Sequence, residues 1–514
     1  MASNCYTSYF ANGINSSEDL KVTIMATKII ATIKSNLMAK YKLQFDALEK
    51  LFTQLINSDE KKGMSTQLIY LDDKMNAVSP EACKAAIDEL YAAHSPDYLL
   101  IFGAQDVVPF QLLDNPLFTP ETDDDEFIPS DLPYACDSAY STDCNAFTNP
   151  TRVIGRLPDL PQTGDLGYVK ILINNSIKSK PVSSKYPIDY FAVTASVWEK
   201  STEQSINNIY GNIKTLLSSP PAKGKYTADQ LRPAFHFYNC HGALNDTNYY
   251  GQKGSSYPVS LSTTDINYKV TYGTVVAAEC CFGAQLLDKK EYGLSIASNY
   301  LLNNALSFMG SSTIAYGPAD GQGLADLICQ YYMINVSNGA STGRALLEAR
   351  QRFLTESAPD LDPYELKTIA QFYILGDPSI QLIRTIPTKS TFNTIENRRL
   401  NLASKGTTLG QSISKTVKVN DHPASGTSSE LSSILQKEDF KNTGLETVFE
   451  VEGLKGDFFP KKLNMMGVTP EDSKVRFRVF QKEVYIKAPV RNIKTLVIKE
   501  INNQVLGWKT YVSR

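Results

Sequence analysis

Residues 234–242 read AFHFYNCHG, and residues 273–283 read GTVVAAECCFG. Each is a short apolar run that ends in polar, reactive side chains followed by glycine, a pattern typical of a buried strand with a loop at its carboxyl end. His241 closes the first run, and Cys280 and Cys281 close the second. If the runs form neighbouring parallel strands, their carboxyl ends open onto one edge of the sheet, which brings an imidazole close to a thiol.

Strand and helix patterns alternate on both sides of these runs. The strand candidates lie at 66–71, 98–102, 152–160, 189–197, 306–317 and 372–383, and the helix candidates lie at 79–94, 164–180, 203–219, 322–337 and 342–357. This alternation favours an α/β fold with a mostly parallel sheet flanked by helices. Residues 20–58 carry apolar residues at three- and four-residue intervals, which predicts a helical N-terminal segment.

The length of 514 residues favours about three domains. We expect residues 1–150 to hold the helical N-terminal segment and a first α/β subdomain, and residues 151–386 to form the catalytic subdomain. Composition changes after about 386, and stretches such as KVRFRVFQKEVYIKA (474–488) alternate apolar and polar residues. Residues 387–514 therefore predict a small β-rich C-terminal domain.

Charge and composition narrow the function classes. Lys and Arg number 51 against 54 Asp and Glu, for a net charge of -3, which excludes a globally basic surface for nucleic acid. The sequence shows no signal-peptide pattern and no apolar run long enough for a membrane helix, so we expect a cytoplasmic protein without a membrane partner. Eight cysteines without a CxxC pair, and four histidines, indicate neither a disulfide scaffold nor a structural zinc site.

The Cys–His pair predicts nucleophilic catalysis. A cysteine thiolate is the attacking species, and a neighbouring histidine raises its share at neutral pH. The backbone amides of Gly242 and Cys280 are the candidates for binding an oxyanion. This chemistry requires no cofactor. The alternative for each residue alone is structural, because buried cysteines are usually inert and a histidine at a strand end often serves only as a polar cap.

Several ordered motifs between about residues 95 and 388 resemble those of the gingipain-like cysteine peptidases, a clan CD family with a caspase-like fold. The motifs are YLLIFGAQDVVP, SDLPYA followed by RVIGRLP, NCHGA, AAECCFGAQL, SFMGSST and FYILGDPSIQLIRTIPTK. The resemblance implies a cysteine endopeptidase that hydrolyses a protein or peptide substrate through an acyl-enzyme. It implies His241 as the catalytic histidine.

The nucleophile is one of two adjacent cysteines. The family's spacing places glycine three residues after the cysteine, which fits Cys280 with Gly283, and we predict Cys280 on that basis. Cys281 with Gly283 is similar to the shorter spacing of the caspases and stays the alternative. On an extended strand the two side chains point to opposite faces.

The residues at the positions for substrate specificity and for orienting the histidine depart from the family pattern. Where the family has an acid that orients the histidine, this chain has Trp198, followed by Glu199, our candidate for that role. Members that cleave after arginine have an aspartate further along, whereas here Glu203 is the only close acid. We expect cleavage after basic residues, with Glu203 in the pocket and Ser312 and Tyr316 in its wall.

Regulation and alternatives remain open at this stage. The acidic loop with Asp123, Asp124 and Asp125 is a weak candidate for calcium, because clustered carboxylates suit a hard cation. Calcium, processing or a regulatory protein partner is expected to activate the peptidase. A catalytically silent member of the fold, acting as a scaffold or binding protein through its C-terminal domain, is the main alternative. A non-peptidase α/β binding protein is the third.

Overall fold

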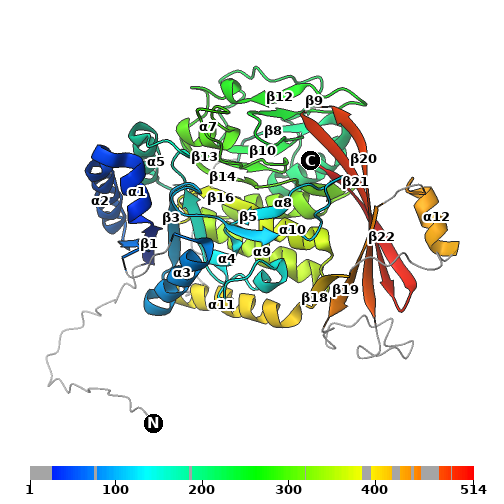
Figure 1. Ribbon diagram of the computed structural model, residues 1–514. Coiled ribbons are helices and arrows are strands. Elements are labelled where there is room, and N and C mark those ends of the chain that lie inside the picture. The colour runs from blue at the N-terminus through cyan, green and yellow to red at the C-terminus, as the bar shows by residue number, and fades with distance from the viewer. Residues whose placement is uncertain are drawn as a thin grey trace, which may run out of the picture.

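The computed structural model describes residues 26–73, 78–183, 188–318, 320–384, 395–419, 429–441, 445–452, 474–487 and 489–514. Helices alternate with strands through most of the chain, and an antiparallel sheet dominates its last part (Figure 1). The fold is therefore α/β with a β-rich C-terminal portion, as the sequence predicts.

A ten-stranded sheet runs through the centre of the molecule. In spatial order its strands are β2 (Met64–Tyr70), β1 (Ala26–Thr32), β3 (Tyr98–Phe102), β6 (Ile154–Leu157), β16 (Phe372–Gly376), β14 (Ala305–Ser311), β13 (Thr274–Ala278), β10 (Phe235–Asn239), β8 (Tyr190–Ala195) and β9 (Leu216–Ser219). Strands β2 to β16 are parallel to one another, and so are β14 to β9; the two halves meet antiparallel at β16 and β14. The expected mostly parallel sheet is confirmed.

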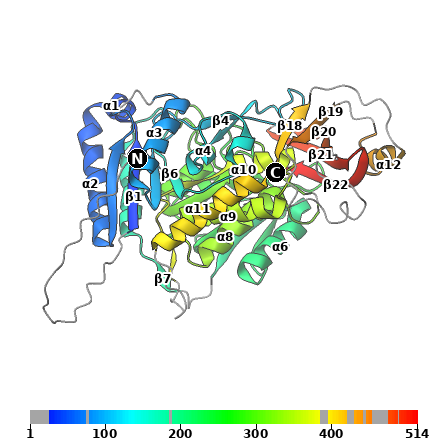
Figure 2. The ribbon, with the colours of Figure 1, turned by 90° about the horizontal axis from the view of Figure 1, so that it is seen from below.

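Helices cover both faces of this sheet (Figures 1 and 2). They are α1 (Lys34–Tyr41), α2 (Phe45–Lys61), α3 (Pro80–His94), α4 (Leu132–Ala135), α5 (Leu166–Lys178), α6 (Glu199–Tyr210), α7 (Ile296–Leu302), α8 (Leu324–Ser337), α9 (Thr342–Ser357), α10 (Pro363–Gln371) and α11 (Ile395–Ser412). One core gathers residues of α2, α5 and α7, and a second gathers residues of α6, α8 and α9. Val276 and Ala278 of β13 belong to the first core and Val275 and Ala277 to the second, so the two cores lie on opposite faces of the sheet.

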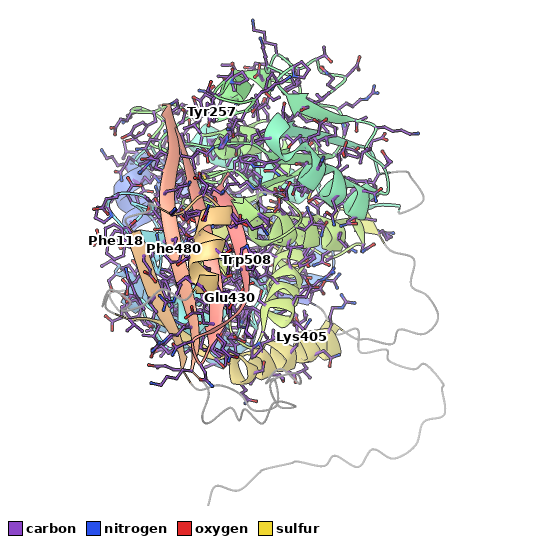
Figure 3. The ribbon with its side chains drawn as sticks, turned by 90° about the vertical axis from the view of Figure 1, so that its right-hand side faces the viewer. Phe118, Tyr257, Lys405, Glu430, Phe480 and Trp508 are labelled. Atoms are coloured by element: carbon purple, nitrogen blue, oxygen red, sulfur yellow. The ribbon has the colours of Figure 1, made fainter. Side chains whose placement is uncertain are left out.

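The C-terminal portion forms a six-stranded antiparallel sheet. In spatial order its strands are β15 (Tyr316–Pro318), β22 (Gln504–Ser513), β21 (Val490–Ile501), β20 (Val475–Lys487), β19 (Leu445–Glu452) and β18 (Lys415–Val419). The helix α12 (Ser429–Lys437) packs on its outer face through Leu431 and Ile434, near Trp508 in Figure 3. Because β15 belongs to this sheet, the sheet extends across the domain boundary expected at residue 386.

Short elements complete the fold. They are the strands β4 (Gln111–Asp114), β5 (Phe127–Ser130), β7 (Val182–Ser183), β11 (Asn248–Tyr250), β12 (Val259–Ser262) and β17 (Ile383–Arg384), and the 3-10 turns Lys42–Gln44, Cys144–Phe147, Ser196–Trp198 and Thr263–Asp265. In the described parts of the chain no helix is both long and apolar enough to cross a bilayer.

The N-terminal segment differs from the expectation of one long helix. Residues 20–25 lie outside the described residues, and Ala26–Thr32 forms β1, which pairs with β2 and β3 inside the sheet. The sequence ATKIIAT is rich in β-branched residues, and its Lys28 is buried because Asp59 and Asp377 pair with its ammonium at 2.6 and 2.9 Å. Lys28 therefore does not mark the solvent-exposed face of a helix, although its spacing from the apolar residues is that of one.

Candidate active site

His241 and the two cysteines follow neighbouring parallel strands. Strand β10 pairs with β13 in a register that places Tyr238 beside Ala278, and the next residues continue side by side because the Glu279 amide donates to the Tyr238 carbonyl at 2.8 Å. Beyond the strand, His241 is held by a bridge to Tyr250, with main-chain hydrogen bonds of 2.8 Å in both directions. The expected juxtaposition of imidazole and thiols at one sheet edge is therefore present.

The two cysteines point to opposite faces of the sheet. Cys280 lies in the core that contains Cys240 and Tyr249, and burial raises the pKa of its thiol well above the usual value. Cys281 lies on the other face, where its sulfur is 3.3 Å from the amide nitrogen and 3.5 Å from the carbonyl oxygen of Ala315. The chain then turns sharply at Phe282, whose φ is 52°, a left-handed value that non-glycine residues rarely adopt.

The hydrogen bonds of His241 determine its tautomer. Its Nε2 lies 2.8 Å from Oε1 of Gln252. The Nε2 of Gln252 donates to Tyr257 Oη at 3.0 Å and to the Gly254 carbonyl at 3.2 Å, so the Gln252 oxygen must face the histidine. The proton therefore sits on Nε2 of His241, and Nδ1 is a bare acceptor without a partner among the described residues.

The site is closed to solvent in this structure. His241 is fully buried, and Cys281 is 3% exposed. Burial lowers the pKa of His241 to about 4, and the positive charge of Arg514 acts in the same direction, whereas the hydrogen bond that Nε2 donates to Gln252 raises it. Burial raises the pKa of Cys281 to about 12. At neutral pH both groups are neutral in this closed state.

Two backbone amides beside the thiol bind a main-chain oxygen. The amide of Cys281 donates to the main-chain oxygen of Arg514 at 3.1 Å, and the amide of Gly242 donates to the same oxygen at 3.4 Å. A Cβ on Gly242 would lie 1.8 Å from the Cys281 carbonyl oxygen, so only glycine allows this approach. The pair has the geometry of an oxyanion hole, built from Gly242 and Cys281 instead of Gly242 and Cys280.

The side chain of Arg514 lies fully buried next to this pair of amides, and we call the residues around its guanidinium the arginine pocket. Its Nη2 donates to the two carboxylate oxygens of Asp326 at 2.8 and 3.0 Å and to the Pro318 carbonyl at 3.2 Å. Asp326 also accepts from Ser201 Oγ at 3.0 Å. A Cβ on Gly317 would lie 2.2 Å from Nη2, so this glycine leaves the space that the guanidinium fills.

Trp198 joins the pocket to the histidine. Its ring centroid is 4.4 Å from that of His241, and the guanidinium carbon of Arg514 lies 4.4 Å from the Trp198 ring. The indole therefore packs against the imidazole and also supplies a cation–π face to the pocket. The sequence reasoning singled out Trp198 as the residue at the position of the family's acid, and the structure places it in contact with His241.

Glu279 is a second acid near the pocket. Burial, with the neighbouring Asp326, raises its pKa well above the usual value, while Arg514 acts in the opposite direction. Nε and Nη1 of Arg514 have no hydrogen-bond partner among the described residues. The arginine pocket therefore carries the carboxylate of Asp326, paired with the guanidinium, and beside it the carboxyl group of Glu279, whose pKa is raised.

Three predicted site residues lie elsewhere. Glu203, on α6, has no ion pair or hydrogen bond among the described residues, and Glu199 accepts from Ser218 Oγ at 3.2 Å, not from His241. Ser312 lines a separate cavity with Gln105 and Phe110.

Tyr316 contributes to the site through its backbone. It pairs with Ser513, while its hydroxyl donates to Asp123 at 2.9 Å, away from the Arg514 side chain. The side-chain hydrogen bond to His241 comes from Gln252, and the ion pair with Arg514 comes from Asp326, rather than from Glu199 and Glu203.

The acidic loop is engaged with protein cations. Asp123 accepts from the Lys367 ammonium at 2.6 and 2.8 Å, and Asp124 pairs with Arg491 at 2.5 Å. Asp125 accepts from the Ile314 amide at 2.7 Å. No group of three or more His, Cys, Asp or Glu side chains suited to a metal occurs in the described residues. Calcium at this loop stays a prediction, and in this structure Asp123 and Asp125 bind Tyr316 and the Ile314 amide, in and just before β15.

One known family model matches the part of the chain that carries this site. Residues 225–383 match the family model described as Peptidase family C25. This stretch contains His241, both cysteines and Asp326. The resemblance to the gingipain-like cysteine peptidases is thus confirmed for these residues. No curated protein matches the chain.

The chain is also similar to solved structures at low sequence identity, and three of them follow. The crystal structure of the Arg-specific cysteine proteinase gingipain R (RgpB) has 10% identity and a TM-score of 0.48, covering 93% of this chain and 96% of that chain. The structure of a protease has 12% identity and a TM-score of 0.47, covering 94% and 97%. The complex of Porphyromonas gingivalis RgpB pro- and mature domains has 11% identity and a TM-score of 0.47, covering 92% and 99%.

Proposed function

We propose that this protein is a cysteine endopeptidase that cleaves protein or peptide chains after arginine, with Cys281 as nucleophile and His241 as proton carrier. The observation that carries the proposal is the position of Arg514. Its main-chain oxygen lies on the amides of Gly242 and Cys281, and its guanidinium lies on Asp326. A residue held in this way occupies the place of the residue before a cleaved bond.

The first half of the reaction follows from this placement. The bare Nδ1 of His241 takes the thiol proton of Cys281, and the thiolate attacks the substrate carbonyl carbon. The oxygen, now negative, keeps the two amide hydrogen bonds of Gly242 and Cys281, which strengthen as charge develops. His241 then gives its proton to the leaving amine, and the C–N bond breaks to leave a thioester on Cys281.

The second half restores the enzyme. A water replaces the departed amine, and Nδ1 of His241 takes its proton as the oxygen attacks the thioester. The same amides bind the second oxyanion, and the thiol leaves as it recovers the proton from His241. Throughout, the Nε2–H of His241 stays bonded to Gln252, which leaves Nδ1 as the nitrogen that accepts and returns the proton.

The pocket supports arginine before the cleaved bond. A guanidinium gains a charge-assisted pair with Asp326 and a cation–π contact with Trp198. A hydrogen bond to a charged group contributes about 1.5–3 kcal/mol, or roughly 10- to 150-fold in rate against an uncharged side chain. The basic-residue specificity expected from the sequence is kept, with Asp326 in place of Glu203.

The silent-scaffold alternative keeps one supporting observation. In this structure the dyad is buried and neutral. Against the alternative stands a complete set of parts: nucleophile, base, paired amides and an arginine pocket, all on one sheet edge. Apolar side chains in the same place would stabilise the fold equally well, so stability alone does not explain this set.

The experiment is a library of fluorogenic peptides that carry Arg, Lys, Gln, Met or Ala before the fluorophore. It is applied to the full chain and to an Arg514→Ala chain, so that an occupied pocket cannot hide activity. We expect release after Arg to exceed release after Gln or Met by about 10- to 100-fold. Parallel assays with added calcium and with a chelator test the calcium hypothesis.

Cys281→Ala is the matched control and should release no fluorophore while keeping the circular dichroism spectrum of the parent. Equal rates for Arg and Met would remove the specificity. Release that survives Cys281→Ala would remove the mechanism.

A further inference from the structure

We infer that the segment Tyr511–Arg514 is an intramolecular inhibitor, which lies in the substrate cleft as the acyl-side residues of a substrate do and keeps the site closed. The inference rests on the proposed function, because it requires the Cys281 site to be the peptidase site. Three observations carry it: the main-chain pairing of the segment, the fit of its arginine, and the burial of the dyad beneath it.

The main chain of the segment is bound as an added strand. Strand β22 pairs antiparallel with β15, with Ser513 opposite Tyr316 and Val512 opposite Gly317. The Arg514 amide donates to the Ala315 carbonyl at 2.9 Å. In the six-stranded sheet β22 is the neighbour of β15, so the side of β15 that faces Ser513 becomes a free strand edge once the segment leaves. Addition of an extended peptide to a strand edge is a general mode of peptide recognition, so this side of β15 suits a substrate strand.

The side chain of Arg514 is held as a specific ligand. It is fully buried, its Nη2 bonds Asp326 and the Pro318 carbonyl, and its guanidinium faces the Trp198 ring. Gly317 leaves the space that the guanidinium takes. A buried arginine used only to fill space would be costly, because desolvating a charge is unfavourable unless a partner compensates it.

The segment and a substrate cannot occupy the site at the same time. The Arg514 oxygen uses the amides of Gly242 and Cys281, which a substrate carbonyl needs. The guanidinium uses the carboxylate of Asp326. With the segment in place, solvent reaches almost none of Cys281 and none of His241.

Release of the segment breaks its pairing with β15 and the end of its pairing with β21, because Tyr511 and Val512 also lie opposite Thr495 and Lys494. Ser513 and Arg514 lie beyond the β21 ladder, and the part of β22 before Tyr511 stays paired with β21. Tyr511 Oη donates to Asp362 at 2.9 Å, and Ser513 Oγ donates to the Arg491 carbonyl at 3.0 Å. A tethered segment has an effective concentration on the order of millimolar or above, so a free peptide competes poorly with it.

The competing explanation is a permanent anchor that fastens the C-terminal sheet and never leaves. The two explanations differ in what happens to the cleft when Arg514 is repelled. Arg514→Glu places a negative charge against Asp326 and Glu279, at a position outside the paired strand. An inhibitor then leaves a vacant cleft that binds peptide, whereas a permanent anchor leaves a cleft that binds none.

The test measures binding without turnover. The peptide acetyl-Tyr-Val-Ser-Arg is titrated by calorimetry into full chains that carry Cys281→Ala, with or without Arg514→Glu. We expect the double variant to bind with a Kd at least tenfold lower than the single variant. Cys281→Ala with Gln504→Glu, an added charge at the exposed start of β22, is the matched control and should bind like the single variant.

Every outcome decides. Equal Kd values for the single and double variants, or no binding to either, overturn the inference. Thermal unfolding of each variant shows that a loss of binding is not a loss of fold. If the double variant gains binding, but Arg514→Glu with Cys281 intact hydrolyses no Arg peptide, the proposed function fails while the blocked cleft stands.

Discussion

The amide nitrogen of Cys281 lies 3.1 Å from the main-chain oxygen of Arg514, on the face of the sheet opposite the Cys280 thiol. In acyl transfer by a thiol, the nucleophile's own amide is well placed to bind the oxyanion that its attack creates. The relation therefore separates the two adjacent cysteines and favours Cys281, where the spacing to Gly283 had favoured Cys280.

The first prediction concerns this pair. In an Arg514→Ala chain, Cys281→Ala should lower kcat/KM for an Arg peptide by at least about 10⁴-fold, because a nucleophile cannot be replaced. Cys280→Ala removes one buried sulfur and should change kcat/KM by less than about tenfold. Limiting iodoacetamide, followed by peptide mass spectrometry, should label Cys281 before Cys280. Activity that depends on Cys280 would reverse the assignment.

The second prediction concerns the pocket acid. In the Arg514→Ala chain, Asp326→Asn keeps the size of the side chain and removes its charge, so kcat/KM for Arg peptides should fall about 30-fold or more, in line with a cost of about 2–5 kcal/mol for unpairing a buried charge. Peptides with Met should change little. Glu203→Gln on the neighbouring helix is the matched control, since it contacts no described residue of the pocket. A larger loss for Glu203→Gln would restore the prediction made from the sequence.

The third prediction uses the space at Gly317. A Cβ there would lie 2.2 Å from Nη2 and 2.3 Å from Nε of Arg514. Gly317→Val should therefore exclude an arginine side chain and lower cleavage after Arg by about 100-fold or more, while cleavage after Ala falls much less. The measurement is the ratio of kcat/KM for Arg and Ala peptides, which removes any general loss of folded protein. An unchanged ratio would place the substrate arginine elsewhere.

The sequence patterns correctly predicted those elements whose structure depends on residues close to them in the sequence. The apolar runs before His241 and Cys280 form β10 and β13. The helix candidate at 79–94 is confirmed as α3, and Ser79 Oγ caps its start by accepting from the Ala82 amide at 3.1 Å. These features depend on neighbours a few residues away.

The features that the sequence did not predict depend on contacts between segments far apart in the chain. Which cysteine faces the cleft is decided by the turn at Phe282 and by the contact with Ala315, neither of which the spacing to Gly283 encodes. Asp326 and Arg514 are 188 residues apart. A signal for Asp326 was present: it is the one acid in the apolar helix LADLICQYYMINV (324–336), and a buried acid needs a partner.

The fourth prediction concerns pH. The pKa of Glu279 is raised in the folded protein, so the folded chain holds a proton that the unfolded chain releases above its ordinary pKa of about 4.3. The neutral carboxyl is fully compatible with folding at low pH, and stability is lost as pH rises toward the folded pKa. Glu279→Gln removes this loss. The stability gap between variant and parent should widen by up to about 1.4 kcal/mol per pH unit.

Thermal and urea unfolding between pH 5 and pH 8 measure this gap. The sign is decisive, because Glu279→Gln should gain relative stability as pH rises. A gap that stays constant, or that shrinks with pH, would mean that Glu279 is ionised in the folded state and pairs with Arg514. Asp326→Asn is the contrasting variant, since its carboxylate is engaged with the Arg514 guanidinium.

The last prediction uses the position of Arg514 at the oxyanion pair. A chain in which a Ser-Gly-Gly linker and a fluorescent domain directly follow Arg514 presents its own Arg–Ser bond to Cys281. The thiolate should attack the Arg514 carbonyl carbon, release the linker amine and, after hydrolysis of the thioester, leave a carboxylate on Arg514. Intact-mass spectrometry should find the cut after Arg514. The rate should be first order and unchanged over a 100-fold range of protein concentration, because the bond and the thiol lie in one chain.

The same fusion with Cys281→Ala should stay intact, and with Arg514→Gln it should be cut roughly 10- to 150-fold more slowly, the factor expected for a lost charge-assisted hydrogen bond. Cutting that rises with concentration would mean that one molecule cleaves another, and that the segment leaves its own cleft before the reaction.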